Sequence, residues 1–169
     1  MATIITDLKE SFRRGNIYIQ LIYINVGVFI FTTLTGVILQ LFNRSLGGVF
    51  EWLELPASLP RFIIQPWSVL TYMFMHAGVL HILFNMLWLY WFGALFLNFF
   101  SARHLRGVYI LGGICGGLLY MTAYNIFPYF RPMTEYSFML GASASVLAIV
   151  AATGNLTTRY VFSFLEPYA

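Results

Sequence analysis

Long apolar runs without any Asp, Glu, Lys or Arg divide the chain into segments. The first run lies between Arg14 and Arg44 and is almost continuously apolar over residues 17–42. About 20 apolar residues are enough to cross the hydrocarbon core of a bilayer, so this pattern predicts one tilted membrane-spanning helix. The run is longer than the roughly 7–15 apolar residues of a cleaved signal peptide, and no small-residue cleavage pattern follows it. We therefore expect the helix to be retained.

Three further apolar segments follow the first one. Residues 62–102 carry no Asp, Glu, Lys or Arg, but a proline and polar residues near the start of this stretch place its beginning in a loop. A short basic turn at residues 103–106 then separates the second span from the third. The sequence predicts an all-α, polytopic membrane helix bundle with four transmembrane helices. The predicted spans are residues 17–42, 78–100, 108–127 and 138–156.

The segments outside the spans define the expected organisation. Residues 43–76 combine Gly and Pro breakers with charged and aromatic side chains, a pattern typical of a loop lying in the membrane interface. We expect residues 1–16 to form a cytoplasmic N-terminal segment, residues 17–156 the transmembrane domain, and residues 157–169 a C-terminal tail. The distribution of Lys and Arg favours a cytoplasmic N-terminus. The inner side would carry Lys9, Arg13, Arg14, Arg103, Arg106 and Arg159, and the outer side Arg44, Arg61 and Arg131.

The composition excludes several classes of protein. Of the 169 residues, 60% are hydrophobic and 9% are charged, whereas soluble domains carry roughly 25% charged residues. This composition rules out both a soluble domain and a disordered chain. The net charge of +3 comes from Lys and Arg residues that are not clustered, so no nucleic-acid partner is expected. The single cysteine, Cys115, excludes an intramolecular disulfide and a Cys-rich metal site.

Polar residues inside the predicted spans are the candidates for function, because burying them in hydrocarbon costs free energy. His81 and Asn85 are four residues apart and therefore lie on one face of a helix. His76 precedes His81 by five residues, a spacing that does not bring two ligands to a common helix face, and no carboxylate is nearby. This pattern does not favour a metal site. Considered alone, His81 and Asn85 favour hydrogen bonding between helices.

The fourth predicted span opens with Gly141, Ala142 and Ser143. On this evidence alone Ser143 is most simply a packing residue, because small residues at four-residue spacing let helices approach closely. The chemical alternative is a nucleophilic serine at a helix start, whose own N–H points toward a developing oxyanion. His81 and Asn85 would be further donors, since the second and fourth spans begin on the same side of the membrane. The small-residue pairs are Gly141/Ser145, Ala144/Ala148, Ala148/Ala152, Gly112/Gly116 and Gly113/Gly117.

Two motifs resemble a known family. The run from His76 to Asn85 has the pattern H-x4-H-x3-N, which resembles the second membrane helix of the rhomboid intramembrane serine proteases. Gly141 to Ser143 resembles the G-x-S motif of their fourth helix. The spacing between the motifs, the loop before His76 and the Gly-rich third helix are similar as well. The resemblance covers about residues 55–152.

The resemblance implies a six-helix fold, of which this chain would carry four helices, and a serine endopeptidase activity. Ser143 would attack a peptide bond of a transmembrane-anchored substrate, and His81, Asn85 and the Ser143 N–H would form the oxyanion hole. His76 would help shape the outer mouth of the site, and residues 43–76 would lie partly in the outer leaflet. No cofactor or metal is implied. The expected partners are transmembrane protein substrates and the lipid bilayer, and the expected location is a bacterial-type inner membrane.

Two features depart from the family pattern. Ala144 follows the serine where the family often has Gly. Rhomboids also activate the serine with a histidine on their sixth span, and a serine hydroxyl without a base is a weak nucleophile. No histidine follows Ser143, and the chain's three are His76, His81 and His104. We therefore expect a truncated or frameshifted rhomboid reading frame that lacks the general base.

The missing base leaves two functions open. The first is a rhomboid-type protease whose present chain carries the nucleophile and oxyanion hole only. The second is a non-catalytic, rhomboid-like membrane protein that binds transmembrane helices. In either case we expect the four spans to be less stable than a six-span relative, or to depend on completing helices or a partner, because polar groups facing lipid cost free energy.

Overall fold

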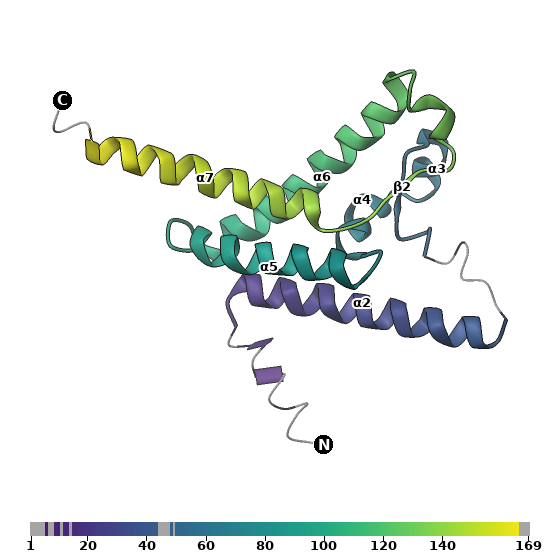
Figure 1. The fold of residues 1–169 in the computed structure, drawn as a ribbon, viewed down its shortest axis with the longest axis horizontal. Helices are drawn as coiled ribbons and strands as arrows, with labels where there is room; N and C mark the ends of the chain where they lie inside the picture. Colours follow the sequence, from purple (N-terminus) through teal and green to yellow (C-terminus); the bar gives the residue numbers. More distant parts are fainter. Residues whose placement is uncertain are drawn as a thin grey trace.

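The computed structural model describes residue 6 and residues 9–10, 12–13, 15–43, 48 and 50–165, with side chains described as far as Gly154. The architecture is the predicted all-α membrane helix bundle, with α5 lying between α2 and α7 and with α6 packed across α7 (Figure 1). Within the described side chains, three helices are long and apolar enough to span a membrane: α2 (Ile17–Leu41), α5 (Val79–Phe96) and α6 (Ala102–Ile126). The fourth helix, α7 (Ser143–Leu165), is apolar over Ser143–Gly154.

The helix α6 begins earlier than the hydrophobic pattern predicts. It starts at Ala102, so the predicted basic turn at residues 103–106 is wrong and these residues form the first turns of the helix. Ser101 precedes the helix, and its Oγ lies 2.9 Å from Nδ1 of His104. Arginine is a good helix former, and its long side chain reaches the headgroup region from a membrane helix. The apolar pattern therefore marks the hydrocarbon crossing, whereas the helix extends beyond it.

The helix α7 begins later than predicted. It starts at Ser143, and Phe138–Met139 form a short strand, β2, instead of the first turn of the span. This strand pairs antiparallel with β1 (Leu55–Pro56). Gly141 then takes a φ of +119°, a conformation that a right-handed helix cannot include. At its other end α7 continues to Leu165, so its backbone is helical through most of the segment predicted as a tail.

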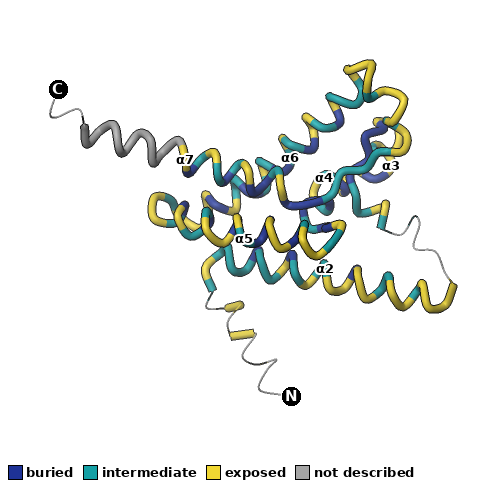
Figure 2. Tube along the Cα trace, in the orientation of Figure 1, coloured by how far each residue is buried: buried dark blue, intermediate teal, exposed yellow. Residues whose placement is uncertain are grey.

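The first loop contributes to the core of the bundle. It contains α3 (Leu59–Ile64), α4 (Ser68–Thr71) and the 3-10 turn η1 (Tyr72–Phe74), and a second 3-10 turn, η2 (Arg131–Met133), follows α6. Leu55, Tyr72 and Met73 are fully buried, and Figure 2 shows buried backbone inside this region. The prediction of an irregular segment is therefore wrong where α3, α4 and η1 form, and the predicted position in the membrane interface stays a prediction. The mixture of charged and aromatic residues in this loop does not indicate which of its side chains are buried.

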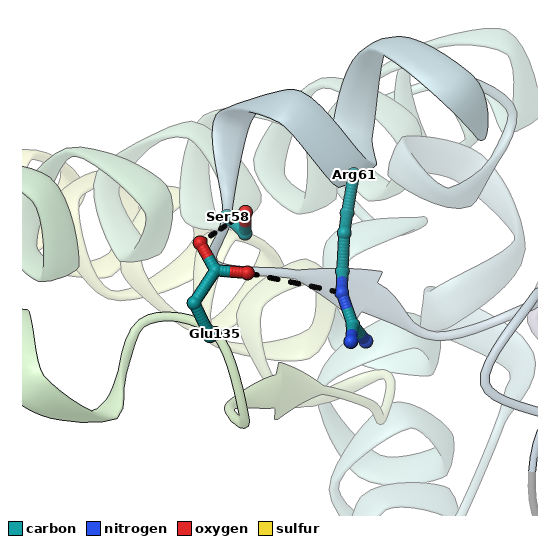
Figure 3. A network of polar contacts seen from close by, with 3 residues as sticks. All are labelled: Ser58, Arg61 and Glu135. Atoms are coloured by element: carbon teal, nitrogen blue, oxygen red, sulfur yellow. Dashed lines mark hydrogen bonds and ion pairs between the residues drawn. The ribbon is translucent and has the colours of Figure 1, made fainter.

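A polar cluster fastens the first loop to the segment that leads into α7 (Figure 3). Ser58 donates a hydrogen bond of 3.0 Å from Oγ to Oε1 of Glu135, and Arg61 Nε lies 3.9 Å from Oε2 of the same carboxylate. The Arg61 guanidinium also lies over the Phe138 ring, 5.5 Å from its centroid. Exposed ion pairs contribute little stability, so the Arg61–Glu135 pair adds little to the stability of the fold.

Two rows of glycines on α6 face different neighbours. A Cβ added to Gly112 would clash with Ala148, and a Cβ added to Gly116 would clash with Ala144, both on α7. This close approach confirms the predicted small-residue packing between the third and fourth spans. The second row, Gly113 and Gly117, faces chiefly the first loop. Its neighbours include Leu55, Tyr72 and Met73.

A buried polar link joins α2, α6 and η1. Asn25 on α2 is fully buried and donates from Nδ2 to the Tyr109 hydroxyl at 3.1 Å and to the Leu21 carbonyl at 2.8 Å. The Tyr109 hydroxyl in turn donates to the Met73 carbonyl at 3.4 Å. These bonds satisfy the Asn25 amide nitrogen and the Tyr109 hydroxyl, which would otherwise be costly inside the bundle, whereas Asn25 Oδ1 is buried without a hydrogen-bond partner.

Candidate active site

A cavity of about 440 Å³ between α5 and α7 brings three of the predicted site residues together. His81 and Asn85 enter it from successive turns of α5, and Ser143 enters it from the first position of α7. The remaining wall is apolar. Its residues are Leu80, Phe84, Trp88, Val146, Leu147 and Val150.

Ser143 is placed where a helix start offers free donors. The first hydrogen bond within this turn runs from the Val146 N–H to the Ala142 carbonyl, at 2.9 Å. The preceding N–H groups at the helix start, including that of Ser143, therefore have no partner in the helix ladder. Ser143 is exposed, whereas Ala142 and Ser145 on either side are fully buried. The hydroxyl and N–H of Ser143 are thus available to a ligand in the cavity.

His81 presents a donor to the turn that carries the serine. Its Nδ1 accepts a hydrogen bond of 3.4 Å from the Ala77 N–H. The proton of the neutral imidazole is then on Nε2, an assignment that follows from this bond. Nε2 lies against Gly141, where an added Cβ would be only 2.8 Å away. His81 is therefore oriented as a hydrogen-bond donor beside residues 141–143, which we call the serine turn.

Asn85 has its amide oriented by its own helix. Nδ2 donates to the His81 carbonyl at 2.9 Å, and the side chain is buried. A carboxamide nitrogen carries two hydrogens, so one remains for a group in the cavity. Ser143, His81 and Asn85 together supply three N–H groups around a single space.

His76 does not line this cavity. It is buried and contacts the His81 ring edge-on, with ring centroids 5.2 Å apart at 64°. Burial, followed by the neighbouring His81, lowers the pKa of His76 from 6.5 to about 4, so the ring is neutral at pH 7. His76 also lines a separate cavity of about 310 Å³ with Glu54 and Thr32. Its influence on the predicted site therefore passes through the His81 ring.

Several residues around the site were not singled out by the sequence. Tyr72 carries no chemical signal in the sequence, because its contacts depend on tertiary packing. Asn25 could have been found, since it is a polar residue in the middle of a charge-free span. Tyr109 pairs with it but looks like any other aromatic residue of the third span. Among the residues whose side chains are described, no group of three or more His, Cys, Asp or Glu residues could hold a metal ion.

The family assignment rests on a match across most of the chain. The family model of the Rhomboid domain matches residues 64–166, which include the α5 motif and the serine turn. The chain therefore belongs to the rhomboid family, whose members are generally serine intramembrane hydrolases. The match extends past residue 152, where the resemblance of the two motifs had been expected to end. A search of curated proteins finds no significant match.

Proposed function

We propose that this chain provides the nucleophile and the oxyanion hole of a rhomboid-type serine endopeptidase that cleaves transmembrane-anchored proteins. The observation that carries the proposal is the meeting of Ser143, His81 and Asn85 in one cavity between α5 and α7. Family membership supplies the reaction class, and the cavity supplies residues suited to it.

In this proposal the Ser143 Oγ attacks the carbonyl carbon of the scissile peptide bond, and the carbonyl oxygen becomes negatively charged. The Ser143 N–H, His81 Nε2–H and the free Asn85 N–H donate to that oxygen. Losing one donor of an oxyanion hole typically lowers the rate about 10²–10³-fold. The low-dielectric, apolar wall of the cavity strengthens these hydrogen bonds.

The Ser143 proton needs an acceptor that none of the three histidines supplies. His81 uses Nδ1 as an acceptor for Ala77 and turns an N–H toward the serine turn. His76 does not line the cavity. His81 lies in the first turn of α5, whereas His104 lies in the first turn of α6, which follows the other end of α5. We therefore infer that none of the three histidines acts as the general base for Ser143.

Exogenous imidazole tests this division of roles. A fluorophosphonate probe reacts when the serine oxygen bonds to phosphorus, fluoride leaves and a base takes the serine proton. We expect no labelling of the chain alone in detergent above the level of Ser143→Ala, and clear labelling of Ser143 when imidazole is added. Robust labelling without imidazole that is lost in Ser143→Ala would show that the chain holds its own base. A folded chain that stays unlabelled with imidazole would refute the nucleophile.

The exposed apolar wall of the cavity favours a second candidate function. Leu80, Phe84, Trp88 and Leu147 are all exposed, so the groove can hold a helix from another protein without any chemistry. A non-catalytic, rhomboid-like binder of transmembrane helices would crosslink to a transmembrane peptide equally well as wild type and as Ser143→Ala. It would also stay unlabelled by the probe with or without imidazole.

A further inference from the structure

The serine turn is held by a residue that takes no part in the cavity. The Gly141 N–H donates to the Tyr72 carbonyl at 2.9 Å. Among the described residues between α6 and α7, Gly141 alone has a positive φ, +119°. The hydrogen bond to Tyr72 holds this residue in place. The orientation of the turn, and with it the direction of the Ser143 N–H, depends on where Tyr72 lies.

Tyr72 is in turn fixed to α6 by its side chain. The side chain is fully buried, and its hydroxyl donates to the Gly113 carbonyl at 2.6 Å. Its ring lies on the glycine face of α6, because a Cβ added to Gly117 would be 3.4 Å from Cε1 of Tyr72. Tyr72 thus connects α6 to the serine turn, through its hydroxyl on one side and its carbonyl on the other.

The adjacent peptide of η1 has an anchor of its own. The Met73 carbonyl accepts from the Tyr109 hydroxyl at 3.4 Å, and Tyr109 is bonded to Asn25 on α2. Neither Tyr72 nor Tyr109 lines the cavity that holds Ser143. The Tyr72 carbonyl nevertheless binds Gly141, the residue packed against the His81 ring.

We propose that Tyr72 is a positioning residue that fixes the serine turn against α6 and so aims the Ser143 N–H and hydroxyl into the cavity. The consequence for chemistry rests on the proposed function, whereas the hold on Gly141 does not. Tyr72→Phe is the suitable change, because it keeps the ring on the glycine face and removes only the hydroxyl. Tyr18→Phe is a matched control that removes a phenol hydroxyl from α2, near the α5–α6 turn.

The first readout is amide hydrogen exchange in the full chain labelled with ¹⁵N-glycine. We expect Tyr72→Phe to speed exchange at Gly141 at least tenfold, while Gly112 and Gly116 in α6 and all glycines of Tyr18→Phe keep their rates. Unchanged exchange at Gly141 would overturn the proposal. Equal acceleration at every glycine would also overturn it, because the hydroxyl would then only support the fold. If Tyr72→Phe does not fold, exchange in the wild-type chain decides, and a Gly141 amide without protection from exchange would overturn the proposal, because its hydrogen bond to the Tyr72 carbonyl would then be absent.

The second readout is fluorophosphonate labelling in the presence of imidazole. We expect Tyr72→Phe to lower the rate of the covalent step about tenfold, with the probe concentration for half-maximal rate unchanged. A change in that concentration alone would contradict a positioning role. If wild type itself remains unlabelled, the proposed function fails, and exchange at Gly141 still decides whether Tyr72 holds the turn.

Discussion

Gly141 and His81 are packed so closely that no side chain fits between them. A Cβ on Gly141 would lie 2.7 Å from Cε1 and 2.8 Å from Nε2 of the imidazole, and the φ of Gly141 is +119°. The packing of the serine turn against the His81 ring therefore requires glycine at position 141. Replacing this glycine would displace both the turn and the ring.

The first prediction concerns Gly141→Ala. We expect the variant to lose about 1–3 kcal/mol of unfolding free energy, from the positive φ and from displacement of the His81 ring. Imidazole-supported labelling of Ser143 should fall with it. Unfolding in mixed detergent micelles measures the first effect. Gly107→Ala is the matched control, since a Cβ there meets nothing within 4 Å, and its stability should stay the same or rise. Equal stability of Gly141→Ala and wild type would contradict the packing described.

The second prediction concerns Ala144, which stands where the family often has glycine. Its Cβ rests against Gly116 on α6, so the extra methyl group is accommodated by a glycine on the facing helix. We expect Gly116→Ala to destabilise the bundle and Ala144→Gly to restore most of that loss in the double variant. A double-mutant cycle should give a coupling of about 0.5–3 kcal/mol. Additive effects would show that the two positions are not in contact.

How much of this arrangement the sequence could predict differs between elements. The helices α2 and α5 follow directly from charge-free runs, and the motif at His81 and Asn85 lies on a helix face as its spacing requires. The start of α7 was placed too early, because Phe138 and Met139 are as apolar as the span that follows. Only tertiary pairing with Leu55 and Pro56 makes them a strand.

The contacts of Tyr72 and Asn25 lay beyond prediction for a different reason. Hydrophobic periodicity identifies which residues leave water, and it does not say which distant partner they meet. Tyr72 bonds to Gly113, 41 residues away, and Asn25 to Tyr109, 84 residues away. Such pairs depend on how the helices cross, which one sequence does not encode in any local pattern.

The third prediction concerns pH. The pKa of His76 is lowered to about 4 in the folded chain from an ordinary value of 6.5, so the unfolded chain binds the proton more tightly. The stability supplied by the neutral ring is complete above pH 6.5 and is lost as the pH falls toward 4. His76→Phe keeps the aromatic contact with His81 and should flatten this part of the profile of stability against pH.

Glu54 titrates as well. Burial and the nearby Glu51 raise the pKa of Glu54, so its contribution to stability changes with pH in the opposite direction to that of His76. The difference between the profiles of wild type and His76→Phe therefore isolates the histidine. Parallel profiles for the two proteins would refute the assignment.

The fourth prediction concerns the buried link between Asn25 and Tyr109. Hydrogen bonds between membrane helices contribute about 0.6 kcal/mol on average, because polar groups find other partners in the unfolded state. We expect a cycle of Asn25→Ala and Tyr109→Phe to give a coupling of about this size, measured by unfolding in micelles. A coupling near zero would mean that α2 is held to α6 by apolar packing alone.

The structure of the phosphonylated chain tests the central claim most directly. A fluorophosphonate adduct on Ser143, formed with imidazole, places a phosphoryl oxygen where the oxyanion of peptide hydrolysis would be. We predict that this oxygen lies about 2.7–3.1 Å from the Ser143 N, His81 Nε2 and Asn85 Nδ2. An adduct on another residue, or a phosphoryl oxygen that faces away from His81 and Asn85, would contradict the proposed oxyanion hole.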